Sequence, residues 1–395
     1  EVMMSKEKRR VPKLRFPGFT EDWEQRKLGD YLIQYTKITT QNNQYPVLTS
    51  SRKGLFFQTD YYDGNQIASK DNTGYNIVPY GYFTYRHMSD DDIFHFNINY
   101  IVDKGIVSTL YPVFTTKNLN SNYLQLQLNY GTEFRKYAVL LKQGGSRTYM
   151  YFNKLKDLKL TLSTSIDEQE IIAKFFIAFE KLITLHQRKL DNLKLKKKAL
   201  LQKLFPKNGE RYPELRFPGF TDAWEQRKLG DIVDFLDGQR KPLKESDRIK
   251  GKYPYYGASG IIDYINDYLF DENLVLLSED GANIIDRNYP VCFIATGKYW
   301  VNNHAHVLKV KTGVIDKFIC ESLERLDYTK FNTGTAQPKL NQDICQKIAI
   351  TLPNEDEQKC ISEFLDRINN IITLHQRKLD HLKLQKKALL QQMFV

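Results

Sequence analysis

The sequence has few cysteines and no long apolar stretch. Its 395 residues include four cysteines, all in the second half and none in a Cys-x-x-Cys pair, so we expect free thiols. No apolar run approaches the roughly 20 residues that cross a bilayer, and residues 1–10 lack the apolar centre of a secretory signal. The sequence therefore predicts a soluble, cytoplasmic protein.

Motifs of the common DNA-modifying enzymes are missing as well. The sequence has no Asp-Pro-Pro-Tyr or Asn-Pro-Pro-Tyr/Phe segment, no glycine-rich S-adenosylmethionine loop and no GxxxxGK[ST] phosphate loop. One Glu-x-Lys of the kind found in nucleases occurs at Glu357, but its repeat counterpart at Glu168 lacks the lysine. This favours a charge at a helix start. No His, Cys or carboxylate cluster has metal-ligand spacing, so we expect no catalytic residue, metal or cofactor in this chain.

Positive charge is in excess. The chain carries 58 Lys and Arg against 47 Asp and Glu, a net charge of +11, with 41% hydrophobic residues. The apolar content is that of a folded protein, and the positive charge favours a polyanionic partner such as nucleic acid. Residues 212–354 nevertheless sum to −2. If this segment binds DNA, it must use a local basic face.

Internal repetition is the strongest signal. Residues 12–30 return as residues 213–231 with sixteen of nineteen positions identical. Residues 182–205 return as residues 371–394 with nineteen of twenty-four identical, and an Asp-Glu-Gln tripeptide precedes both copies at the same offset. The chain therefore alternates domain, helix, domain, helix.

Between these repeated pieces the two halves differ almost completely in sequence. Short β-branched and aromatic runs such as 76–86 and 305–310 predict strands, and residues 120–130 and 316–326 predict helices packed on them. The predicted fold class is α+β, with two similar mixed α/β domains whose surfaces differ. The predicted division is a first domain at 12–165, a first spacer helix at 166–206, a second domain at 212–354 and a second spacer helix at 355–395.

Apolar residues recur at steps of four and three along both predicted helices, which is typical of a coiled coil. His186 and Lys197 interrupt the first seam, and His375 and Lys386 interrupt the second at the same steps. Polar seam residues set register and partner choice, so the simplest partners are the two helices themselves, antiparallel and pseudo-twofold; a metal or proton role for the histidines is the alternative. The predicted seam residues are Ile172, Phe176, Phe179, Ile183, His186, Leu190 and Leu193, and Ile361, Leu365, Ile368, Ile372, His375, Leu379 and Leu382.

A helix over residues 168–204 would be roughly 55 Å long at 1.5 Å per residue. One turn of B-DNA is about 34 Å. Domains at the two ends of such a helix could read sites about one turn or more apart.

The chain resembles the specificity subunit of bacterial type I restriction-modification enzymes. The resemblance is carried by LRFPGF-x-x-x-WEQRKLGD, by the Asp-Glu-Gln helix start, by HQRKLD-x-L-K-L-x-KKALLQ and by their duplication, and it covers essentially the whole chain. It implies that each variable segment is a target recognition domain that reads half of an interrupted, asymmetric DNA sequence. It also implies two methyltransferase subunits docked on the helices and motor-nuclease subunits beside them. S-adenosylmethionine, ATP and Mg²⁺ would belong to those partners, and this chain would do no chemistry.

Polar, turn-flanked segments of both variable domains are the candidates for DNA contact, because phosphates and base edges require cationic or polar side chains. Loops at Gly145 and Gly334 precede the long helices at matching positions and are expected to face one functional surface. Any single candidate could instead be an ordinary solvated side chain. The candidates are Thr49, Ser50, Arg52, Lys53, Arg86, His87, Ser146, Arg147 and Thr148 in the first domain, and Gln239, Arg240, Lys241, Ser259, Lys298, Trp300, Asn302, Asn303, His304, Thr335, Gln337 and Lys339 in the second.

The near-identical openings, with Leu14, Phe16, Trp23 and their copies, are predicted to be packing residues, and a docking surface for identical partners is the alternative. The rival function is a coiled-coil adaptor whose two domains bind proteins without DNA specificity. A self-sufficient nuclease or methylase is a second rival, and the missing motifs disfavour it.

Overall fold

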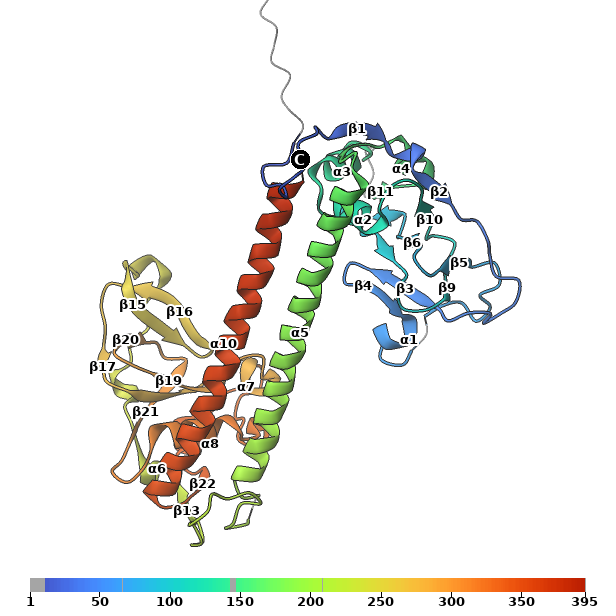
Figure 1. Cartoon of the computed structure of the whole chain (residues 1–395). Helices are drawn as coiled ribbons and strands as arrows, with labels where there is room; N and C mark the ends of the chain where they lie inside the picture. Colours follow the sequence, from blue (N-terminus) through green and yellow to red (C-terminus); the bar gives the residue numbers. More distant parts are fainter. Residues whose placement is uncertain (1–10, 66, 143–146, 208, 395) are drawn as a thin grey trace, which may run out of the picture. The chain divides into compact units, whose positions relative to one another are not determined.

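A computed structural model describes residues 11–394 except 66, 143–146 and 208. Candidate Ser146 and the terminal Val395 lie outside these residues. The chain forms two compact units (Figure 1). Unit 1 comprises Glu1–Gln187 and Lys378–Val395, and unit 2 comprises Arg188–Arg377.

Unit 1 is a mixed α/β unit built on short strands. β1 (Glu24–Lys27) pairs antiparallel with β12 (Lys159–Leu162). A four-stranded sheet has the order β2-β10-β6-β8, with β2 at Leu32–Gln34, β10 at Val113–Thr116, β6 at Phe83–Thr84 and β8 at Asn97–Ile98. Three further pairs join β3 (Leu48–Ser51) to β4 (Gly54–Phe57), β5 (Asn76–Pro79) to β9 (Lys104–Val107), and β7 (Met88–Ser89) to β11 (Thr148–Tyr149). The short helices are η1 (Leu28–Asp30), α1 (Gln58–Tyr61), α2 (Ser121–Tyr130), α3 (Thr132–Leu140) and α4 (Phe152–Asp157).

Unit 2 repeats the frame of unit 1. β13 (Glu225–Lys228) pairs antiparallel with β22 (Ala349–Leu352), as β1 pairs with β12. A first four-stranded sheet has the order β14-β21-β18-β19, with β14 at Val233–Phe235, β21 at Ala305–Val310, β18 at Leu274–Ser278 and β19 at Cys292–Ala295. A second has the order β16-β15-β20-β17, with β16 at Gly260–Ile265, β15 at Lys250–Gly257, β20 at Lys298–Val301 and β17 at Phe270–Asp271. The short helices are α6 (Leu229–Ile232), η2 (Asp237–Gln239), η3 (Glu245–Asp247), α7 (Asn283–Asp286), α8 (Asp316–Glu324), η4 (Tyr328–Lys330) and α9 (Gln342–Cys345).

Two helices of 39 residues each, α5 (Ile166–Leu204) and α10 (Glu355–Met393), accompany these units. The predicted fold class, two similar mixed α/β domains with two long helices, is confirmed. The strand prediction at 305–310 matches β21. The run at 76–86 is instead split into β5 and β6, because a turn with Gly81 at φ +81 intervenes and Pro79 cannot donate to a ladder.

The openings are tied to the helix starts by buried ion pairs. Arg15 donates to both carboxylate oxygens of Glu168 at 2.6 and 2.9 Å, and the Trp23 indole donates to the same carboxylate at 3.1 Å. In unit 2, Arg216 donates to Glu357 at 2.8 and 2.7 Å. Both glutamate side chains are fully buried, which agrees with a structural role for the glutamate at the helix start. The repeated opening and the repeated Asp-Glu-Gln therefore recur together because they contact each other.

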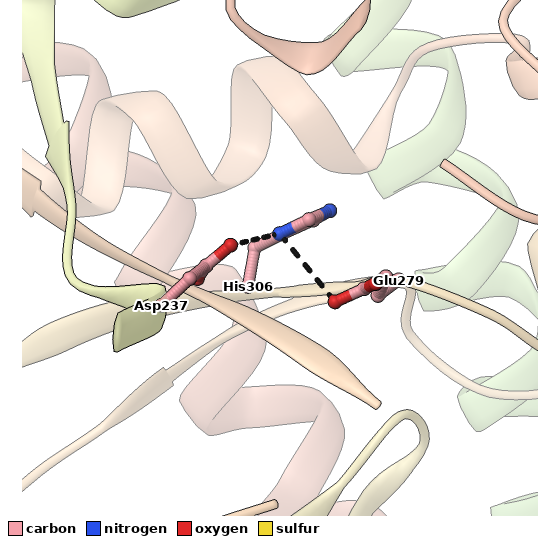
Figure 2. A group of neighbouring side chains, drawn as sticks. All are labelled: Asp237, Glu279 and His306. Carbon is pink, nitrogen blue, oxygen red and sulfur yellow. Dashed lines mark hydrogen bonds and ion pairs between the residues drawn. The ribbon is translucent and has the colours of Figure 1, made fainter. Parts of the chain in front are cut away.

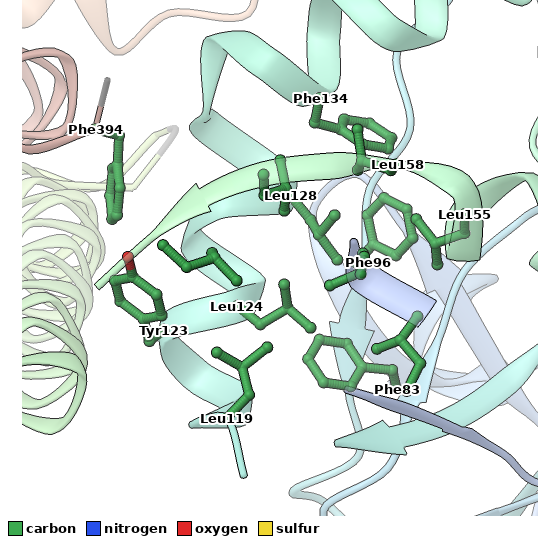
Figure 3. Packing of buried hydrophobic residues seen from close by; sticks show 14 of the residues in the cluster. Phe83, Phe96, Leu119, Tyr123, Leu124, Leu128, Phe134, Leu155, Leu158 and Phe394 are labelled. Carbon is green, nitrogen blue, oxygen red and sulfur yellow. The ribbon is translucent and has the colours of Figure 1, made fainter. Parts of the chain in front are cut away.

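The long helices complete the cores of both units. In unit 1 the core includes Phe176 of α5 and, from the end of the chain, Met393 and Phe394. Figure 3 shows Phe394 beside Tyr123, with ring centroids 6.0 Å apart. The core of unit 2 takes Leu204 and Phe205 from the end of α5, and Ile361 and Leu365 from the start of α10. Each unit therefore closes around one part of each helix.

All fourteen predicted seam residues are buried or half-buried. Within unit 1 the two helix parts run antiparallel, because Phe176 packs on Phe394 while Glu180, one turn later in α5, pairs with Lys386, which lies earlier in α10. The two lysines that interrupt the seams, Lys197 and Lys386, also contact residues outside the long helices. Lys386 also donates to the Tyr130 hydroxyl at 3.1 Å, and Lys197 in unit 2 pairs with Glu321 of α8 at 3.0 Å.

Among the described residues, no helix has both the length and the apolar character needed to cross a bilayer.

Candidate nucleic-acid interface

The β3–β4 hairpin of unit 1 brings several predicted residues to one hollow. Arg52 and Lys53 form its exposed turn. Thr49, Ser50 and Arg52 line a hollow of about 220 Å³ together with Arg86. Ser50 is buried and donates to a backbone carbonyl, so it supports the hairpin, whereas the two arginines keep exposed surface.

Three consecutive aspartates after β7 hold cations from separate segments. Arg147 donates its Nε to Asp90 at 2.7 Å, and Lys142 donates to Asp92 at 3.2 Å. Arg52 donates Nη2 to Asp91. This hydrogen bond, with one from Ser89, lowers the pKa of Asp91 to about 2. Sequence reasoning singled out both arginines but missed the aspartates, which are charged residues in an exposed loop.

Aromatic rings lie beside these cations. The His87 ring stacks on Tyr151 with centroids 5.0 Å apart, and Tyr149 stacks on Tyr151 at 5.8 Å. Both tyrosines are exposed. Thr148, the predicted residue between Arg147 and Tyr149, is fully buried and donates to Asp92. The tyrosines were missed by sequence reasoning, although their alternation around the buried Met150 is the pattern of a strand with one outward face.

In unit 2 the predicted Arg240 belongs to a buried ion-pair network. It donates to Glu279 at 2.6 Å and lies 3.3 Å from Asp237. Figure 2 shows Asp237 and Glu279 on either side of Nδ1 of His306, at 2.5 and 3.8 Å. Burial opposes a charge on His306, but hydrogen bonds with Asp237 and Cys345 prevail and raise its pKa to about 10. Arg240 also donates to three backbone carbonyls, so it acts as a framework residue.

Asp237, Glu279 and His306 place three metal-ligand atoms within 4.8 Å of one another, although they are far apart in the sequence. Their hydrogen bonds favour an ion-pair network over a cation site. Nε2 of His306 lies 2.7 Å from the Leu340 carbonyl, and Nδ1 lies against a carboxylate. A ring that donates from both nitrogens has no lone pair for a metal.

Loops from three parts of unit 2 meet beside this network. Nδ1 of His304 lies 2.8 Å from a carboxylate oxygen of Asp280. The backbone of Asp280 forms an isolated antiparallel β-bridge with Lys339. The Gly281 amide donates to the Pro338 carbonyl at 3.0 Å. The structure thus joins the predicted segments 302–304 and 335–339. The candidates exposed in unit 2 are Gln239, Lys241, Ser259, Lys298, Asn303, His304, Thr335, Gln337 and Lys339.

Other unit 2 candidates are placed differently. Trp300 is buried and donates to the Lys241 carbonyl at 2.6 Å, and Asn302 is buried and accepts from the His304 amide at 2.8 Å. Both side chains support the loops through hydrogen bonds to backbone groups. Lys298 lies at the other end of β20 from Val301, over the Tyr268 ring at 4.5 Å. It is separated from the loop cluster by the length of that strand.

Comparison with known proteins identifies relatives of the chain. Residues 221–384 match the type I restriction modification DNA specificity domain family. The Haemophilus influenzae specificity subunit S.HindORF215P is 33% identical over 162 residues, 41% of either chain. The Methanocaldococcus jannaschii MjaVIII specificity subunit is 25% identical over 47% of this chain and 45% of its own. These two matches span less than half of each relative.

Similarity also extends along nearly the whole chain. The Methanocaldococcus jannaschii MjaX specificity subunit is 22% identical over 94% of this chain and 92% of its own length. The crystal structure of a type I restriction-modification S subunit from M. genitalium has the same fold, with a TM-score of 0.61 at 14% identity over 98% of this chain and 99% of its own. The chain is thus similar in sequence to type I restriction-modification specificity subunits and shares the fold of one of them.

Proposed function

We propose that this chain is the non-catalytic subunit that gives a type I restriction-modification complex its DNA sequence specificity, and that it recognises a bipartite, asymmetric site. One observation carries the proposal: the same frame is built twice, with near-identical openings and helices, while the loops that present polar side chains differ between the units. Because different side chains read different base edges, each unit would read its own half-site.

The long helices would set the gap between the two half-sites. Each has 39 residues, so each is roughly 58 Å long at 1.5 Å per residue. Each unit closes its core around parts of both helices. A change in helix length would therefore change the separation of the two reading surfaces.

The outer faces of the helices support docking of identical partners. Leu182, Leu185 and Leu195 of α5 are 39–67% exposed, and their copies in α10, Ile371, Leu374 and Leu384, are 44–66% exposed. Exposed apolar residues at the same positions in both repeats suit two copies of one partner. We propose two methyltransferase subunits that carry S-adenosylmethionine, joined by motor-nuclease subunits that use ATP and Mg²⁺. Action on chromosomal DNA would place the assembly in the cytoplasm.

Selection from a random duplex library tests the proposal. The full chain, assembled with its methyltransferase partner, should enrich a two-part motif with a constant gap. Affinity should fall steeply with salt for every duplex, while the motif keeps an advantage of 10³-fold or more over unrelated duplexes. A coiled-coil adaptor without DNA specificity predicts no motif at any salt concentration.

A further inference from the structure

The loop Asp90–Asp92 connects segments of unit 1 that are distant in the sequence. Asp91 accepts from Arg52 in the β3–β4 turn, and Asp90 accepts from Arg147, which directly precedes β11. Asp92 accepts from Lys142 and Thr148. Ser89 donates to Asp91 at 2.9 Å and so fixes its carboxylate. Three adjacent carboxylates are thus each paired with a different cation.

The two arginines keep free surface in spite of these pairs. The side chain of Arg147 is 51% exposed and that of Arg52 is 56% exposed. Asp90 contacts Arg147 through Nε, which does not occupy the two terminal Nη groups. Because Asp90 pairs with Nε, both Nη groups of Arg147 can donate to O6 and N7 of guanine, the most frequent specific contact in the major groove.

Arg240 of unit 2 provides an internal contrast. It also pairs with two carboxylates, but its side chain is only 12% exposed, and backbone carbonyls accept its remaining hydrogen bonds. An arginine in that setting supports the loops around it. The arginines of unit 1 have a carboxylate on one side only, so they are oriented but not enclosed.

The charge balance of the loop suits DNA as the ligand. An isolated surface ion pair contributes little to stability, so three adjacent pairs are better explained by placement of the cations. Asp90, Asp91 and Asp92 offset Arg147, Arg52 and Lys142, while the neighbouring Arg86 and Lys53 are exposed. Phosphates can be contacted by those two residues, and the paired arginines are left for bases.

We propose that Asp90 and Asp91 are positioning residues in the half-site read by unit 1. Asp90 holds Arg147 with both Nη groups directed to a guanine. Asp91 holds Arg52 through Nη2, which leaves Nη1 for a single contact with a base edge. This inference rests on the proposed function. It assigns the specificity-determining residues of one half-site and the carboxylates that orient them.

The test compares motifs selected from a random duplex library by the full chain with its methyltransferase partner. Asp90→Asn keeps the shape of the side chain and weakens its hold on Nε. It should reduce the preference for one guanine roughly tenfold, and Arg147→Ala should abolish preference at that same position. Asp91→Asn and Arg52→Ala should act together on a different position. The half-site read by unit 2 should stay unchanged in all four variants, and so should the whole motif in Asp103→Asn, which alters an exposed aspartate away from this loop.

Arg147→Lys keeps the charge but lacks the fork, so it should lose the same guanine preference. Retention of that preference in Arg147→Lys or Asp90→Asn would overturn the inference, and so would an equal loss at every position of both half-sites. If the wild-type chain selects no motif, the proposed function itself fails. If the wild-type chain selects a two-part motif and the aspartate variants select the same motif, the positioning role is rejected while the proposed function stands.

Discussion

Phe394 directly follows α10 and packs into the core of unit 1. Its ring lies 6.0 Å from Tyr123, 6.2 Å from Phe176 and 6.5 Å from Trp23. Replacement of a buried phenylalanine by alanine costs about 3–5 kcal/mol, from lost burial and from the cavity that remains. Phe394→Ala should therefore destabilise unit 1 by that amount, although Phe394 lies 218 positions beyond its ring neighbour Phe176 in the sequence.

Hydrogen exchange followed by mass spectrometry measures the two units separately. A loss of about 3–5 kcal/mol should speed exchange in α2 of unit 1 by roughly 10²–10³-fold or more, because each 1.4 kcal/mol is a factor of ten. Exchange in α8 of unit 2 should change little. Phe205→Ala, the repeat counterpart, should give the reverse result, since Phe205 packs on Phe318 at 5.2 Å. Leu384→Ala, which truncates an exposed side chain of α10, is the control. Faster exchange of α8 in Phe394→Ala would refute the assignment of this residue to unit 1.

Three further predictions concern the buried ion pairs and the helices. Arg15→Ala leaves the buried Glu168 carboxylate without its cation and should lower the free energy of unfolding of unit 1 by about 3 kcal/mol in urea, whereas Lys13→Ala, at an exposed neighbour, should have little effect. His306 has a raised pKa of about 10, so its pairing with Asp237 stabilises unit 2 fully at pH values below the ordinary histidine pKa near 6.5. The free energy of unfolding should then fall as the pH rises through 10. Urea unfolding of His306→Gln should lack this fall with pH. Deletion of one heptad from both long helices shortens each by about 10 Å and should shorten the preferred gap by about three base pairs, at 3.4 Å each. Mapping of methylated adenines checks this, and an unchanged gap contradicts the helix-length model.

Local patterns were sufficient to predict the helices and part of the frame. The seam spacing of α5 and α10 is a local property, and every predicted seam residue is shielded in the structure. The Asn120 side chain accepts from the Tyr123 amide at 3.0 Å and starts α2 where the sequence predicted a helix. The run at 76–86 was predicted less well, because its apolar content does not reveal the turn that divides it.

The candidate surface was predicted only as a set of polar loops. Sequence type did not separate Arg52 and Arg147, which are exposed, from Arg240, which is enclosed. All three are arginines near turns, and the difference depends on which carboxylates and carbonyls surround them. Trp300 and Asn302 were chosen for their chemistry, but both are buried beneath the loops. DNA contact by the exposed candidates stays a prediction.

The sequence by itself determined the duplication, the long helices and their seams, because identity between copies and heptad spacing are visible without any knowledge of contacts. Only the tertiary structure decided that Met393 and Phe394 close the core of unit 1, and that three adjacent aspartates pair with cations from separate loops. Both depend on residues that meet across roughly 40 to 370 positions of chain. No local pattern encodes such pairings, because they result from the way the whole unit packs.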